Sequence, residues 1–177
     1  MVKRNEGIAM KNVLIGLLLF SCSALAHDHR HHNAHVHGAG KLGIAFEGAN
    51  GKMDLKIPSE SIFGFEHAAK TKKQKAVQKA GITTLEQKIS SLVVFESSLA
   101  CVITTDKVEV VKGKRSTHSD TVAAYAIKCA KSPIGTVITF NFQNEFPKIK
   151  DLDVEIVADN IQKAVEVKAS GTRLELK

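Results

Sequence analysis

The sequence predicts an α+β fold: a mostly antiparallel β-sheet single domain with one main helix, preceded by a disordered His-rich arm. Apolar and polar positions alternate in residues 41–57 and again in short stretches beyond Leu99, which is typical of β-strands separated by turns. Residues 70–92 carry apolar side chains at helical spacing instead. Residues 27–38 are polar and show no periodicity, which predicts a segment that is disordered without metal.

Residues 1–26 have the features of a secretory signal peptide. A basic start precedes an apolar run at 13–20, which is too short to span a bilayer, and Ala24-Leu25-Ala26 forms a small-residue cleavage site. Met10 begins a second, shorter signal of the same kind. Cleavage after Ala26 makes His27 the first mature residue.

Leu19-Phe20-Ser21-Cys22 offers a second processing route, because it loosely resembles a bacterial lipobox. Processing at that point would leave Cys22 as a lipidated first residue. Phe20 fits the pattern poorly, so cleavage after Ala26 is the preferred interpretation. Both routes take the chain out of the cytoplasm, and the predicted location is the periplasm.

The charge balance of the exported chain is mildly basic. The whole chain has 25 basic and 18 acidic residues, and removal of the signal takes away three basic residues and one acid, leaving 22 and 17. The remaining length suits one domain. Nucleic acid is a poor partner, because the chain is exported and has no tryptophan and one tyrosine for stacking on bases.

The first folded element is predicted to be a β-hairpin. Leu42, Ile44 and Phe46 alternate with small or polar residues, and a second alternating run ends at Pro58. Gly48-Ala49-Asn50-Gly51 between the two runs is predicted to be the turn, with Asn50-Gly51 as the strongest turn signal.

One helix is predicted over residues 70–92. Thr71 and Gln74 fit a capping box at its start. The apolar stripe consists of Val77, Gly81, Leu85, Ile89 and Leu92. The lysines Lys70, Lys72, Lys73, Lys75 and Lys79 lie at the helix start, where they indicate a solvated face or contact with an anionic membrane.

Strands are predicted for the rest of the chain. Short runs separated by short turns favour antiparallel pairing, with the helix packed against the sheet. The predicted ranges are 101–105, 107–112, 121–129, 136–142, 151–157 and 162–168, with a last short strand at 172–176.

Two cysteines, Cys101 and Cys129, follow the predicted signal, each in an apolar stretch with strand character. In an oxidising compartment such a pair predicts a disulfide, and closing a loop of about 28 residues stabilises the fold by on the order of 3 kcal/mol. A pair of thiolate metal ligands is the alternative. The disulfide is favoured because neither cysteine has a second Cys or His at ligand spacing.

The order of motifs along the chain resembles the ZrgA-like family of periplasmic zinc-binding proteins linked to bacterial zinc uptake. An H-x-H-G segment before a hairpin, a G-F-E-H segment before a lysine-rich helix, and two cysteine-bearing strands carry this resemblance. It spans nearly the whole mature chain, and it implies zinc as the ligand. The matching residues are His35-Val36-His37-Gly38, Gly64-Phe65-Glu66-His67, Cys101, His118, and Tyr125 with Cys129.

The histidines around these motifs predict a composite zinc site. Zinc takes about four N, O or S ligands in a tetrahedron. His35 and His37 flank one residue, so an extended segment places both rings on one face, about 6.6 Å apart along the chain. Glu66 and His67 offer a carboxylate and an imidazole side by side. The hypothesis joins His35 and His37 to His67, completed by Glu66, His118 or water.

Ordinary structural roles remain open for the same residues. His67 fits a helix cap, Glu66 fits an ion pair with Lys70, and His118 fits a surface position beside Ser119. The histidine-rich arm itself fits a solubilising tail.

Six of the eight histidines fall within residues 27–37. His27, His29, His31 and His32 are predicted to form a collecting arm of lower affinity. After cleavage at Ala26, the free amine, two backbone nitrogens and the imidazole of His29 would form a square-planar nitrogen set that suits Cu²⁺ or Ni²⁺.

Four functions compete on this evidence. The leading hypothesis is capture of periplasmic Zn²⁺ for delivery to a zinc transporter in the inner membrane. A metal buffer or copper-binding protein without a transfer partner is the second, and a structural β-domain is the third. A zinc hydrolase with Glu66 as general base is disfavoured, because no H-E-x-x-H motif is present, and the chain is predicted not to be an enzyme.

Overall fold

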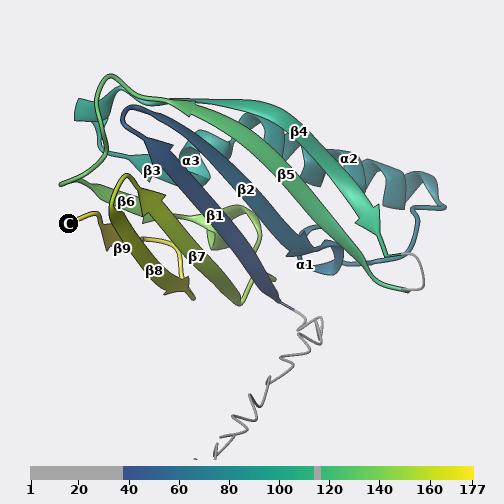
Figure 1. The fold of residues 1–177 in the computed structure, drawn as a ribbon. Helices are drawn as coiled ribbons and strands as arrows, with labels where there is room; N and C mark the ends of the chain where they lie inside the picture. The colour runs from purple at the N-terminus through teal and green to yellow at the C-terminus, as the bar shows by residue number, and fades with distance from the viewer. Residues whose placement is uncertain (1–37, 114–116) are drawn as a thin grey trace, which may run out of the picture. The chain divides into compact units, whose positions relative to one another are not determined.

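The predicted hairpin lies within a six-stranded sheet in the computed structural model, which describes residues 38–113 and 117–177 (Figure 1). The hairpin strands are β1 (Ala39–Glu47) and β2 (Asn50–Pro58), as the alternating pattern predicted. The turn between them is Gly48-Ala49, because Asn50 and Gly51 already pair with Glu47 and Phe46. The strand order is β4-β5-β2-β1-β7-β8. The other strands are β4 (Val102–Lys112), β5 (Ser119–Lys128), β7 (Asp151–Ala158) and β8 (Ile161–Val167).

One pairing in this sheet departs from the antiparallel expectation. β1 pairs in parallel with β7, from Ala39 beside Asp151 to Phe46 beside Ala158. The other neighbours in both sheets are antiparallel, so the predicted class of a mostly antiparallel α+β fold is right in outline. Local alternation predicts a strand but carries no information about a partner more than a hundred residues away, which is why the parallel pair was missed.

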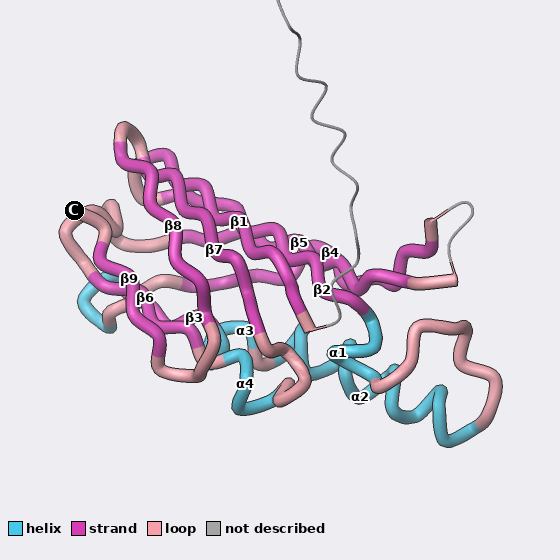
Figure 2. Tube along the Cα trace, turned by 90° about the horizontal axis from the view of Figure 1, so that it is seen from below, coloured by secondary structure: helices cyan, strands magenta, loops and turns pink. Residues whose placement is uncertain are grey.

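A small second sheet and the helices cover one face of the large sheet (Figure 2). This second sheet has the order β3-β6-β9. Inward-facing residues such as Leu42, Met53 and Ile156 share one core with Ile138 and Phe140. The opposite face of the large sheet carries the exposed residue of each alternating pair. The second sheet consists of β3 (Val93–Phe95), β6 (Val137–Phe140) and β9 (Thr172–Glu175).

The main helix is shorter than predicted. α2 (Lys72–Gln87) is capped by Lys88, and a separate helical turn, α3 (Ile89–Leu92), continues the apolar stripe into the core. The predicted capping box of Thr71 and Gln74 is present. α2 is held against the sheet by the buried Tyr125, whose hydroxyl donates to the Leu85 carbonyl at 3.2 Å. Burial raises the pKa of this hydroxyl.

Other boundaries differ from the sequence prediction for local reasons. Two predicted strands form the single long strand β4, in which a register shift between Thr105 and Lys107 accommodates an extra residue. A short helix, α1 (Ser59–Phe63), lies between the predicted hairpin and the predicted main helix, where the sequence pattern predicted no element. The strand predicted to end at residue 142 stops at Phe140, and a helical turn follows. The additional short helices are η1 (Ser97–Leu99) and α4 (Phe142–Glu145).

The predicted disulfide between Cys101 and Cys129 is present, with an S–S distance of 2.01 Å. The two cysteines flank the paired residues Val102 and Lys128, so the bond closes one end of the β4–β5 pair. No helix in residues 38–113 and 117–177 is both long and apolar enough to cross a membrane. The predicted signal peptide and histidine-rich arm lie outside the described residues, apart from Gly38.

Candidate metal site

One edge of the large sheet gathers the ends of four strands. β1 begins at Ala39 beside the start of β7, and β2 ends at Pro58, which pairs with Asp120 near the start of β5. The backbone carbonyl of Gly38 accepts hydrogen bonds from the N–H groups of Lys150 and Asp151 at 2.9 and 3.0 Å. The histidine-rich segment therefore joins the fold at this edge.

The G-F-E-H segment lies at the same edge because α1 follows β2 directly. Gly64 ends α1 with a φ of 85° and donates to the Glu60 carbonyl at 2.8 Å. This left-handed conformation favours glycine, and a Cβ at Gly64 would also lie 3.1 Å from the ammonium of Lys148. The tight turn sends Phe65 and Glu66 back across the sheet edge.

Glu66 is fixed to the start of β5 at two points. Its backbone carbonyl accepts a hydrogen bond from the Ser119 hydroxyl at 2.7 Å. Its carboxylate Oε2 contacts Nδ1 of His118. The side chain of Glu66 is 12% exposed and that of His118 is 40% exposed, so the pair lies at the boundary between protein and solvent. A further buried contact, between the hydroxyls of Ser59 and Thr121 at 3.1 Å, attaches α1 to the same strand.

The contact engages Nδ1 of His118, which is the arrangement found around many histidines that bind a metal through Nε2. When Nδ1–H donates to a carboxylate, Nε2 carries the lone pair, and this arrangement is common for histidines that ligate zinc. The carboxylate also fixes the orientation of the ring. Alternatively, the Glu66 carboxylate can itself act as an oxygen ligand.

His67 is placed differently. Its ring is exposed and stacks on Phe65, with centroids 5.2 Å apart, and Nδ1 donates to the Ala68 carbonyl at 3.0 Å. In the described part of the chain, His67 does not form a group of three potential ligands with Glu66 and His118. The six arm histidines, His27, His29, His31, His32, His35 and His37, lie outside the described residues.

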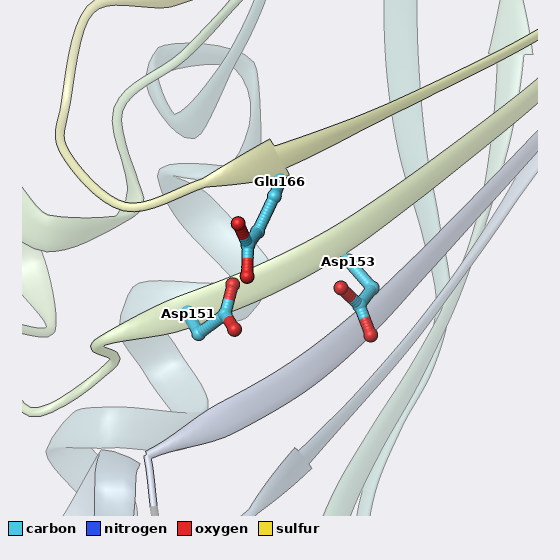
Figure 3. A group of neighbouring side chains, drawn as sticks. All are labelled: Asp151, Asp153 and Glu166. Carbon is cyan, nitrogen blue, oxygen red and sulfur yellow. The ribbon is translucent and has the colours of Figure 1, made fainter.

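A second group of potential ligands was not predicted from the sequence. Asp151, Asp153 and Glu166 lie on the exposed face of β7 and β8, with carboxylate oxygens within 4.8 Å of one another (Figure 3). Asp153 and Glu166 are cross-strand partners, and such pairs become visible only once the register is known. An all-oxygen set suits Mg²⁺, Mn²⁺ or Ca²⁺ better than zinc.

Local charges perturb this acidic group. Two effects raise the pKa of Asp151: the carboxyl is partly removed from water, and it forms a hydrogen bond with Glu166. The pKa of Glu166 is lowered by the Lys168 ammonium, whose Nζ lies 2.6 Å from Oε2 of Glu166. Because the folded state holds the Asp151 proton more tightly than the unfolded state, this carboxyl favours folding below its unfolded pKa. That contribution is lost as the pH rises through the folded pKa.

We therefore expect Asp151→Asn to raise the melting temperature at about pH 7.5 by about 1–3 °C and to change it little at about pH 3. The substitution removes the repulsion between ionised carboxylates, which exists only at the higher pH. Thermal unfolding followed by circular dichroism at both pH values measures the effect. A destabilisation of equal size at both values would contradict it.

The comparison with known families points to the metal. The family model described as ZrgA family zinc uptake protein matches residues 34–176, and that range includes His35, His37, Glu66, His67 and His118. The family description names zinc uptake and no enzymatic reaction. No curated protein matches the chain.

Proposed function

Since this chain belongs to the ZrgA family of zinc uptake proteins, we propose that it captures Zn²⁺ in the periplasm and delivers the ion to an uptake system in the inner membrane. The contact between Glu66 and His118 at the sheet edge where the arm joins the domain is the observation that supports this proposal most directly.

The position of the first described strand supports a site shared by the arm and that contact. Asp120 and the start of β1 are separated by β2 alone, and neighbouring strands lie about 4.8 Å apart, so Ala39 and Asp120 are about 10 Å apart across the sheet. His37 and His118 each precede these positions by two residues. Two imidazole side chains extending from those positions are long enough to share one ion.

The proposed site combines His35 and His37 with Nε2 of His118. Glu66 orients the His118 ring or supplies an oxygen, and His67 or water completes a tetrahedron. Zinc binding requires neutral imidazoles, so affinity should fall as the pH drops below about 6.5. Ligand exchange with a partner, or a locally acidic surface, then releases the ion.

The outer histidines of the arm, His27, His29, His31 and His32, are proposed to collect zinc at lower affinity. Several imidazoles on one short segment raise the local ligand concentration. The ion can then transfer to the tighter site within the same molecule. Loss of this segment should reduce the number of bound ions more than it reduces the tightest affinity.

Titration of zinc into the mature chain starting at His27, beside a variant lacking residues 27–34, tests this division. We expect one tight site to survive the deletion while the stoichiometry falls, because His35, His37, Glu66 and His118 remain. Calorimetry with zinc and with copper reports both quantities. Loss of all tight zinc binding, or tight binding of copper alone, would place the main site at the mature amino terminus and favour a copper-binding or buffering role.

A further inference from the structure

The first half of α2 is exposed on nearly every side. Among residues 71–80 only Gln74 and Gln78 are partly buried, and full burial begins at Gly81. A Cβ at Gly81 would lie 2.7 Å from the ring of Phe63, so the helix makes its close contact with α1 at this point. Figure 1 shows the preceding turns extending beyond the end of β4. Packing against the core therefore does not determine which residue types occur at positions 70–79.

This exposed segment holds the excess charge of the exported chain. Residues 70–85 contain five lysines and no acid. Once the predicted signal is removed, the chain has 22 basic and 17 acidic residues. Without these five lysines, the rest of that chain has 17 of each and is neutral overall. The charge is concentrated on one projecting element and is not spread over the surface. The five residues are Lys70, Lys72, Lys73, Lys75 and Lys79.

The lysines are unfavourable for the helix that carries them. Lys72 and Lys75 are three residues apart, and Lys75 and Lys79 are four apart, so like charges face each other along the helix. The first turn contains no acidic residue, although the amino terminus of a helix favours negative charge. The capping box of Thr71 and Gln74 offsets part of this cost. Such a local conflict without a packing reason is typical of a functional surface.

The residue types indicate a diffuse anionic partner. Residues 70–79 contain no arginine and no aromatic residue, and Val77, at 39% exposed, is the largest exposed apolar side chain among them. Protein interfaces are enriched in aromatic residues and arginine and depleted in lysine. Clustered lysines, which are strongly hydrated point charges, suit the anionic headgroups of a lipid bilayer. We propose that residues 70–79, the lysine segment at the start of α2, adsorb to an anionic phospholipid membrane.

Adsorption would also orient the domain. α1 leaves the sheet edge at Pro58, and α2 contacts α1 at Gly81, so the lysine segment projects from the same end as Glu66 and His118. Membrane contact through this segment therefore turns the candidate metal site toward the bilayer. Adsorption itself does not depend on zinc binding, and it can be tested with the metal absent.

Co-sedimentation with lipid vesicles tests the proposal on the mature chain. The vesicles are phosphatidylcholine with or without phosphatidylglycerol, in chelator and low salt. The pH is kept above the ordinary histidine pKa of about 6.5, so that imidazoles add little positive charge. We expect binding only to vesicles that contain phosphatidylglycerol, and its loss at about 1 M salt, where the Debye length is about 3 Å. The triple variant Lys72→Gln, Lys75→Gln, Lys79→Gln should bind about a hundredfold more weakly.

A charge-matched control separates the lysine segment from net charge. Lys52, Lys128 and Lys131 are exposed and lie toward the other end of β2 and β5, so replacing all three with glutamine removes the same charge elsewhere. We expect this control to bind nearly as well as the unmodified chain. The lysine-segment variant should melt at the same or a higher temperature, because repulsion along α2 is relieved.

Two results would overturn the proposal. Equal losses in both triple variants would show that net charge alone drives adsorption. Failure to bind either kind of vesicle would remove the membrane as the partner and leave an acidic protein surface as the one that fits the charge.

Discussion

A His118→Ala variant is expected to bind zinc at the proposed domain site about a hundredfold more weakly, because it loses the proposed nitrogen ligand that contacts Glu66. The substitution is best made in the chain lacking residues 27–34, so that the outer histidines do not mask the loss. Competition against a chromophoric zinc chelator at about pH 7.5 measures the affinity, because neutral imidazole then predominates.

Companion variants assign the roles within this site. Glu66→Gln preserves the size of the side chain but removes its charge, and an orienting role predicts a loss of about 10- to 100-fold. His67→Ala should cost less, because its ring stacks on Phe65 away from the Glu66–His118 contact. Asp151→Asn is the matched control on the exposed face of the sheet. Unchanged affinity in His118→Ala together with a large loss in Asp151→Asn would move the metal site to the acidic group.

Removal of the disulfide is expected to have the largest effect on stability. Replacing Cys101 and Cys129 together with alanine releases a loop spanning 28 positions, which in the chain-entropy model costs about 3–4 kcal/mol. For a domain of this length, that lowers the melting temperature by about 10 °C. Thermal unfolding of the double variant, compared with the parent chain in the presence and absence of reductant, measures the change.

Zinc affinity provides the control for this variant. The disulfide lies at the end of β5 opposite Ser119, so its removal should leave the Glu66–His118 site intact at a temperature where the domain is folded. If zinc affinity fell with the loss of the cysteines, thiolate coordination would become the better explanation for the pair. A decrease in melting temperature of less than about 3 °C would show that strand pairing alone holds this end of the β4–β5 pair together.

Local patterns predicted most elements of the fold. The hairpin followed from strict alternation in its two strands, but its turn was placed too late: Asn50 and Gly51 pair within β2, and Gly48 and Ala49 form the turn. The start of α2 followed from the capping box at Thr71. The break at Lys88 was missed because the apolar stripe continues from α2 into α3 without losing its spacing. The parallel partner of β1 was missed because no local signal specifies pairing between distant strands.

The residues of the candidate site were predicted from the sequence, but the contact between Glu66 and His118 was not. Glu66 and His118 are 52 positions apart, and their contact depends on the turn at Gly64 and on the register of β5 with β2. The acidic group had no sequence signal at all, because Asp153 and Glu166 meet through cross-strand register. Motif resemblance therefore identified candidate ligands, while long-range pairing determined which of them meet.

In a chain exported through the predicted signal peptide, the central position of β1 would set an order of folding. Such a chain would emerge amino-terminal end first, so the arm histidines would reach the medium outside before β5 and β7 do. β1 can pair early with β2, but its parallel partner β7 arrives late, and such long-range pairing is slow. Zinc bound during this interval would be held by the arm alone, since His118 and Glu66 meet only after β5 has joined the sheet. Under the proposed function, the emerging chain would thus bind zinc before the site on the folded domain has formed.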